Sequence, residues 1–192
     1  MVFISLQPFN VRKTFLLAVA LLCLSSLSSF AEPILISVPS TPYDRQMTRI
    51  RSVLSTKQSA RKENLSLALV NHWIQDLRGI PYGFSPQWKT PSEVDTAPVA
   101  DCKGKSVALY QKMNSHGAQN VRLVIGKRTR TSRKTHAWLE WQTGTARYLL
   151  DPTINWAAYR ADEINNGTYL PLYAYSGVRK YRANTATLLA KN

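Results

Sequence analysis

The sequence predicts a single α+β domain in which helices precede a run of antiparallel strands. A length of 192 residues suits one domain better than two. Apolar residues recur at intervals of three and four in the first half of the chain and alternate with polar residues in the second half. These are the periods of helices and of strands. With 44% hydrophobic and 19% charged residues, the composition excludes wholesale disorder.

Residues 1–31 are expected to be a signal peptide rather than part of the fold. Arg12 and Lys13 precede an apolar run over residues 14–24, and Ser29 and Ala31 occupy the −3 and −1 positions of a cleavage site. The apolar run is well short of the ~20 residues that span a bilayer, and an uncleaved anchor is the alternative. The sequence therefore predicts a periplasmic or secreted protein whose membrane contact is limited to an uncleaved signal.

The net charge indicates which partners the protein can bind, and the number of cysteines indicates whether it can form a disulfide. The formal net charge is +14, which favours anionic partners. For an exported protein these are acidic protein segments or envelope polymers rather than nucleic acid. Cys23 lies in the predicted signal peptide, so the exported chain would keep Cys102 as its one cysteine, without an internal disulfide.

The predicted elements follow in order along the chain. Residues 32–61 form an N-terminal extension that is irregular at its prolines and partly helical over residues 44–59, with most helix faces solvated. The domain of residues 62–192 starts with a core helix over residues 62–77, whose apolar positions recur at three and four. The residues of that stripe are Leu67, Val70, Ile74 and Leu77.

Two further helix starts precede the strands. Thr90 and Glu93 form a capping box around Pro91, and Asp101 caps a second core helix that ends near Gly117. Strands are expected over residues 121–125, 135–141 and 147–150. The next strand, residues 169–175, contains a proline and is placed near a sheet edge.

Cys102 falls in the first turn of the helix that Asp101 caps. The unpaired backbone N–H groups and the helix dipole favour an anion there, and Lys103 and Lys105 add positive potential. Such a position favours the nucleophilic thiolate. The alternative is a cysteine that is buried as a small hydrophobic residue.

His136 and Asp151 are expected to meet across a hairpin. With a two-residue turn at Thr143 and Gly144, the two side chains lie directly opposite each other on one face. A carboxylate beside a histidine fixes the imidazole tautomer and stabilises its cation. A chance polar pair is the alternative, but together with Cys102 the pair supplies the groups of an activated-thiol enzyme.

Three motifs resemble, in order, the core motifs of the transglutaminase-like superfamily: Asp101-Cys102, THAWLE at residues 135–140 and LDPT at residues 150–153. WKTPSE at residues 88–93 is similar to bacterial transglutaminase-like cysteine peptidases. The resemblance covers about residues 64–156. It implies a papain-like transglutaminase core, in which the nucleophile helix packs on an antiparallel sheet. It also implies that Cys102 is the nucleophile, His136 the general base and acid, and Asp151 the orienting carboxylate.

The sequence departs from this family after the cysteine. Bacterial peptidases of this type often carry acidic residues there, and some of them use calcium, whereas this chain has Lys103 and Gly104. Calcium needs several oxygen ligands, so we expect no metal at this site and no cofactor.

For each remaining candidate site residue, a structural or solvated role is the alternative to a role in the site. The backbone N–H of Cys102 is expected to be one oxyanion donor, and Gln87 or Trp88 the second, unless they are a surface amide and a packed aromatic. Trp138 shares a face with His136 and either lines the substrate site or packs in the core. Basic residues of a flexible loop over residues 126–134 either attract acidic substrates or are simply solvated; they include Arg128, Arg130 and Arg133.

The sequence thus predicts an exported thiol hydrolase that cleaves peptide or amide bonds through an acyl-enzyme. Its expected partner is a protein or peptide substrate, acidic or associated with the envelope, and not nucleic acid. Two alternatives stay open: acyl transfer to an amine, and a catalytically inactive binding module that keeps the fold. The oligomeric state is not predicted.

Overall fold

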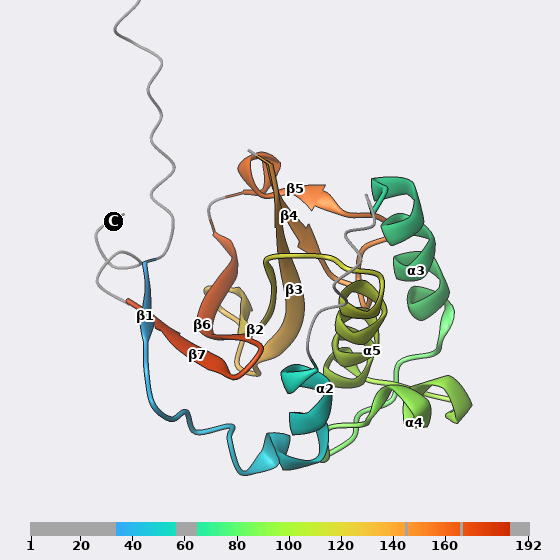
Figure 1. Ribbon diagram of the computed structural model, residues 1–192, viewed down its shortest axis with the longest axis horizontal. Coiled ribbons are helices and arrows are strands. Elements are labelled where there is room, and N and C mark those ends of the chain that lie inside the picture. Colours follow the sequence, from blue (N-terminus) through green and yellow to red (C-terminus); the bar gives the residue numbers. More distant parts are fainter. Residues whose placement is uncertain (1–33, 57–64, 145, 166, 185–192) are drawn as a thin grey trace, which may run out of the picture. The chain divides into compact units, whose positions relative to one another are not determined.

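Two helices begin at the caps predicted from the sequence, Thr90 and Asp101. The computed structural model describes residues 34–56, 65–144, 146–165 and 167–184 (Figure 1), so the predicted signal peptide lies outside the described residues. All described residues belong to one compact unit, Glu32–Asn192. Its helices are η1 (Gln46–Ile50), α2 (Arg51–Ser55), α3 (Leu67–Gly79), α4 (Pro91–Thr96), α5 (Cys102–Ser115) and η2 (Ala161–Glu163).

Each of the three longest helices has a hydrogen-bonding cap. The Ser66 side chain accepts from the first turn of α3, and Thr90 and Glu93 form the expected capping box at α4. Asp101 accepts from the backbone N–H of Gly104 in α5 (3.1 Å). Such side chains satisfy N–H groups that a helix cannot pair internally. Within the described ranges, no helix combines the length and apolarity that a membrane span requires.

The strands form one antiparallel sheet in the order β1-β7-β6-β2-β3-β4-β5. They are β1 (Leu35–Ser37), β2 (Val121–Thr129), β3 (His136–Thr143), β4 (Ala146–Leu150), β5 (Tyr159–Arg160), β6 (Thr168–Ser176) and β7 (Arg179–Ala183). The α2, α3, α4 and α5 helices lie to one side of this sheet (Figure 1), and α5 contacts β2 and β3. The α+β class and the helix-on-sheet arrangement predicted from the sequence are confirmed.

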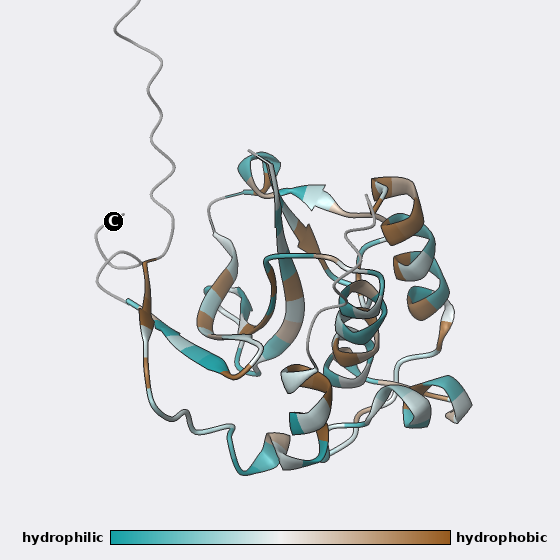
Figure 2. Ribbon diagram, in the orientation of Figure 1, coloured by the Kyte–Doolittle hydropathy of each residue, from teal (hydrophilic) through white to brown (hydrophobic). Residues whose placement is uncertain are grey.

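The main core fills the space between α5 and the sheet. Its buried residues include Val107, Leu109, Met113, Leu123, Ile125, Leu139 and Leu150. Because successive strand residues point to opposite faces, Val124 and Trp138 belong to a smaller cluster with Leu149 and Ala174. Hydrophobic and hydrophilic segments alternate along β3 (Figure 2). The two clusters together make the sheet apolar on both faces where β3 and β4 lie side by side.

The strand that contains Pro171 is not at an edge, contrary to the sequence prediction. β6 lies between β7 and β2, and the register shifts between Ile125 and Gly126, where Gly126 pairs with Pro171. A bulge of this kind lets a central strand accept a residue without an N–H. A Cβ on Gly126 would lie 2.1 Å from the Leu170 carbonyl oxygen, so glycine is required for this close approach.

The N-terminal extension contributes to the core more than its polar sequence suggested. Met47, Ile50, Val53 and Leu54 of η1 and α2 are buried in the main cluster, although most helix faces were expected to be solvated. Residues 35–37, expected to be irregular, pair with β7 as β1. The helical prediction beyond residue 56 lies outside the described residues.

Candidate active site

Cys102 is the first residue of α5, as predicted. It is 8% exposed, and Asp101 precedes it in an extended conformation with its carboxylate turned back onto the helix. Cys102 therefore lies at the positive end of the helix dipole, where an anion is favoured. This environment suits a thiolate that is shielded from bulk solvent.

Asp101 is completely buried, and its carboxylate connects the start of α5 to the segment around Ser85. Its Oδ2 accepts hydrogen bonds from the backbone N–H of Ser85 (3.3 Å) and from the Lys103 ammonium. Lys103 also donates to the Ser85 carbonyl oxygen (2.8 Å). Lys105 is buried and donates to the carbonyl oxygen of Ile80. The two lysines expected to surround Cys102 with positive potential therefore also fix α5 to its neighbours.

His136 and Asp151 form an ion-pair contact in which the Nε2 and Oδ2 atoms lie 2.7 Å apart. His136 is the first residue of β3, and Asp151 directly follows β4. The aspartate side chain is fully buried, and the histidine side chain is 13% exposed. A short contact at this burial is a charge-assisted hydrogen bond, which fixes the imidazole ring.

The register of the β3–β4 hairpin, which joins the two residues, differs from the predicted register by two residues. The ladder ends at Thr143 and Ala146, with Gly144 in the turn at φ +54°. His136 and Asp151 are therefore diagonal neighbours instead of directly opposite. A shift of two residues keeps every side chain on its original face, whereas a shift of one would have reversed it.

The pKa of His136 is raised to about 9. Burial alone would lower it, but hydrogen bonds to Asp151 and Cys102, and the charges of both groups, more than compensate. Asp151 contacts Nε2, so Nδ1 is the ring nitrogen that Asp151 leaves open. The pKa of Asp151 is lowered, because hydrogen bonds outweigh the effect of burial. The three groups together can hold an imidazolium between two anions.

Tyr169 is a member of this group that the sequence interpretation missed. Its hydroxyl donates to Asp151 Oδ2 (2.9 Å), while the backbone N–H of Thr153 donates to Oδ1 (2.9 Å). Burial, followed by the charge of Asp151, raises the pKa of Tyr169, so the phenol stays a donor. The sequence marked residues 169–175 only as a strand, because nothing local relates Tyr169 to Asp151.

Trp138 does not line a substrate cleft, because it is completely buried. Its ring stacks beside that of His136 at a centroid distance of 6.3 Å, and Tyr169 meets it edge-on at 5.4 Å. The structure thus favours the core alternative given above. Trp138 supports the histidine from within the protein.

The two candidates for the second oxyanion donor have different surroundings. Gln87 is exposed, and its Oε1 accepts from Arg49 (2.8 Å). Trp88 is 1% exposed, and its indole N–H has no hydrogen-bond partner among the described residues. No described contact joins either side chain to Cys102, so the second donor stays a prediction.

The predicted basic loop is shorter and more ordered than expected. β2 continues to Thr129, so Arg128 is an exposed strand residue. A turn follows in which the backbone N–H of Ser132 donates to the Thr129 carbonyl oxygen (3.1 Å) and the Ser132 hydroxyl oxygen accepts from the backbone N–H of Thr129 (3.0 Å). Arg130 and Arg133 are exposed at this turn. All three arginines lie on the segment that leads to His136.

No cluster of three or more metal-ligating side chains is found in the described part of the chain. His72 faces Asp76 on the exposed side of α3 (3.6 Å), and His116 follows the last turn of α5. Near Cys102, Lys103 occupies the Asp101 carboxylate. These residues do not suit a divalent cation, which needs several oxygen ligands.

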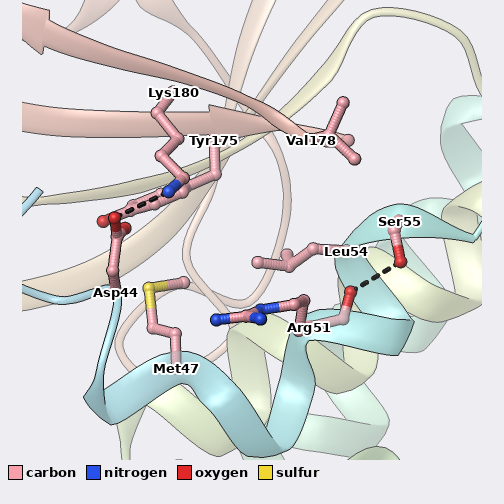
Figure 3. A pocket seen from close by; sticks show the side chains of 9 residues that line it. Asp44, Met47, Arg51, Leu54, Ser55, Tyr175, Val178 and Lys180 are labelled. Atoms are coloured by element: carbon pink, nitrogen blue, oxygen red, sulfur yellow. Dashed lines mark hydrogen bonds and ion pairs between the residues drawn. The ribbon is translucent and has the colours of Figure 1, made fainter. Parts of the chain in front are cut away.

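A pocket of about 240 Å³ lies elsewhere in the described structure (Figure 3). η1, α2 and the β6–β7 hairpin line it, with Met47 and Leu54 on one side and Val178 on the other. The ion pair of Lys180 with Asp44 (2.6 Å) closes one end. None of the candidate site residues lines this pocket, so it is not the site of Cys102.

Cys102 at the start of α5, His136 in β3 and Asp151 after β4 lie in a fold that matches a transglutaminase-like fold. The chain is similar to LapG of Legionella pneumophila, a transglutaminase-like cysteine protease. The EGTA-treated LapG structure has a TM-score of 0.54 and 14% identity, covering 77% of this chain and 81% of LapG. The calcium-bound structure has a TM-score of 0.54 and 13% identity, covering 75% and 81%. At this identity the likeness shows the fold alone. No protein-family model and no curated relative matches the chain.

Proposed function

We propose that this protein is an exported thiol hydrolase that cleaves peptide or amide bonds with Cys102 as nucleophile, His136 as general base and acid, and Asp151 as orienting carboxylate. The observation that carries the proposal is the 2.7 Å contact of His136 with Asp151, in an imidazole whose pKa is raised by Asp151 and also by Cys102. The LapG-like fold supports the same class of chemistry.

In the acylation step, the thiolate of Cys102 attacks the carbonyl carbon of the scissile bond. The carbonyl oxygen becomes an oxyanion, to which the backbone N–H of Cys102 donates, with Trp88 or Gln87 as the proposed second donor. The tetrahedral intermediate collapses when the C–N bond breaks and His136 gives its proton to the leaving amine. Asp151 keeps the ring oriented and stabilises its cation before that transfer.

In the deacylation step, His136 takes a proton from water as the water oxygen attacks the thioester carbon. The C–S bond then breaks, the acid product leaves, and the imidazolium–thiolate pair is restored. An amine in place of water would give acyl transfer, which uses the same groups. Hydrolysis is proposed because water needs no acceptor site.

The proposed substrates are acidic segments of periplasmic, secreted or envelope-associated proteins. The net charge of +14 and the exposed Arg128, Arg130 and Arg133 support this choice, and the N-terminal sequence supports export. LapG has been solved in a calcium-bound form. Because Lys103 occupies the Asp101 carboxylate here, we expect EGTA to leave the activity of this protein unchanged.

The proposal is tested by comparing wild type with Cys102→Ala and His136→Ala on extracts of envelope and secreted proteins. New protein termini are identified by mass spectrometry, and circular dichroism checks that each variant is folded. We expect cleavage by wild type alone, and weaker residual cleavage by Asp151→Asn, which misorients the imidazole without removing it. Identical termini with wild type and Cys102→Ala would instead favour the binding module. Products joined to an added amine would favour acyl transfer.

A further inference from the structure

An exposed aromatic segment runs beside the residues that lead into Cys102. Tyr82 forms a parallel bridge with Ala100, and the backbone N–H of Gly83 donates to the Ala100 carbonyl oxygen (3.3 Å). Alternate residues of an extended chain point to the same side, so Tyr82 and Phe84 share one side. They are 59% and 70% exposed. The bridge partner Ala100 lies two residues before Cys102.

The Phe84 ring contacts two ammonium groups, one from the segment of Cys102 and one from the segment of His136. Lys103 Nζ is 5.0 Å from the ring centroid, and Lys134 Nζ is 5.9 Å from it. Lys103 directly follows Cys102, and Lys134 precedes His136 by two positions. The ring therefore bridges the segment that carries the nucleophile and the segment that carries the histidine.

The two lysines differ in what they can still bind. The Lys103 ammonium is held by Asp101 and by the carbonyl oxygen of Ser85. Lys134 is exposed, and among the described residues its ammonium contacts the Phe84 ring without a carboxylate partner. The two buried carboxylates of the site are already paired, Asp101 with Lys103 and Asp151 with His136. Lys134 is thus a cation beside an aromatic ring, and its N–H groups can donate hydrogen bonds to a ligand.

We infer that Phe84 and Lys134 form a carboxylate subsite beside Cys102. The inference rests on the proposed function and specifies its substrate: the subsite binds an Asp or Glu side chain of the residue next to the scissile bond. The methylene groups of that side chain pack on the Phe84 ring, and its carboxylate accepts charge-assisted hydrogen bonds from Lys134. This contact selects Glu over Gln at one substrate position, which attraction at a distance cannot do.

The test compares two thiol reagents that differ only in charge. Iodoacetate and iodoacetamide both alkylate a thiolate, forming a carbon–sulfur bond as iodide leaves, but only iodoacetate carries a carboxylate. Rates at Cys102 in the full chain are read by mass spectrometry of the peptide that contains it. We expect Lys134→Gln to lower the ratio of the iodoacetate rate to the iodoacetamide rate about fivefold, the effect of one charge ~4 Å away in water. Phe84→Ala is expected to act in the same direction.

The control is Lys112→Gln, which removes the same charge at the other end of α5, roughly 15 Å away by the helix rise. It is expected to leave the ratio unchanged. An unchanged ratio in Lys134→Gln would overturn the subsite, even where Cys102 reacts fast and the proposed function stands. A lowered ratio at a Cys102 that reacts no faster than a free thiol would support the subsite and count against the hydrolase.

Discussion

Tyr169 donates a 2.9 Å hydrogen bond to Asp151 from a strained backbone conformation. Its φ is +51°, a left-handed value that is rare for a bulky residue and costs about 1–3 kcal/mol. The ring is fixed edge-on against Trp138, and the register shift opposite β2 lies two residues further along β6. The bend in β6 thus directs the hydroxyl to the oxygen that also accepts from His136.

Tyr169→Phe is expected to lower kcat/KM about tenfold, because a hydrogen bond to a charged group contributes about 1.5–3 kcal/mol. The hydroxyl helps to lower the pKa of Asp151, so its loss should raise that pKa. The acid limb of the pH–rate profile would then move to higher pH. Tyr173→Phe, on the same strand, is the control. An unchanged profile in Tyr169→Phe would limit Tyr169 to packing.

The stability of the fold should fall in alkaline solution through His136. Its pKa is raised from 6.5 to about 9 in the folded protein. The folded state therefore binds the proton more tightly, and this contribution is complete below about pH 6.5 and lost as the pH rises through about 9. Urea unfolding of wild type and His136→Ala at pH 6 and pH 10 measures it. A difference between the two proteins that does not change with pH would contradict the raised pKa.

Lys103 balances the charge of the buried Asp101. Lys103→Met should therefore lower the free energy of unfolding by about 3 kcal/mol, because it leaves a buried charge without its partner. Urea unfolding at neutral pH measures this loss. The double variant Asp101→Asn, Lys103→Met should recover part of it, because no buried charge then remains. Lys112→Met is the control for removing a lysine from α5. An equal loss in both single variants would show that the pair contributes nothing specific.

The parts of the site that depend on local sequence could be predicted from the sequence. Asp101 caps the helix that starts at Cys102, and a cap acts within one turn. The shared face of His136 and Asp151 could also be predicted, because it depends only on the two-residue period of a strand. Their exact register could not, because it depends on the turn around Gly144.

Contacts between distant segments could not be predicted. Tyr169 reaches Asp151 because β6 lies beside β2. Pro171 had indicated that this strand lies at an edge, so its pairing with β2 was not expected. The bulge that admits Pro171 requires Gly126 on another strand. The burial of Trp138 likewise depends on β6, since Tyr169 covers its ring. Each of these contacts joins residues that no local pattern relates.

The three exposed arginines near His136 should attract acidic substrates before contact. Arg128 lies near enough to Tyr169 for its charge to act on the phenol, and Arg130 and Arg133 flank the turn that leads to His136. Positive charge at a site entrance raises the encounter rate with anionic substrates. Salt weakens the effect, because the Debye length falls from about 30 Å at 0.01 M to about 3 Å at 1 M.

Replacing Arg128, Arg130 and Arg133 together with Gln should lower kcat/KM for an acidic substrate about tenfold at low salt. The value of kcat should stay nearly unchanged, since the chemical groups are untouched. The matched control replaces three other exposed arginines with Gln, which changes the net charge by the same amount. They are Arg45, which precedes η1, and Arg179 and Arg182 of β7. Steady-state rates are measured from low to high salt. An equal loss in the control would assign the effect to net charge. No loss in either variant, with a wild-type rate that is independent of salt, would show that the arginines are only solvated.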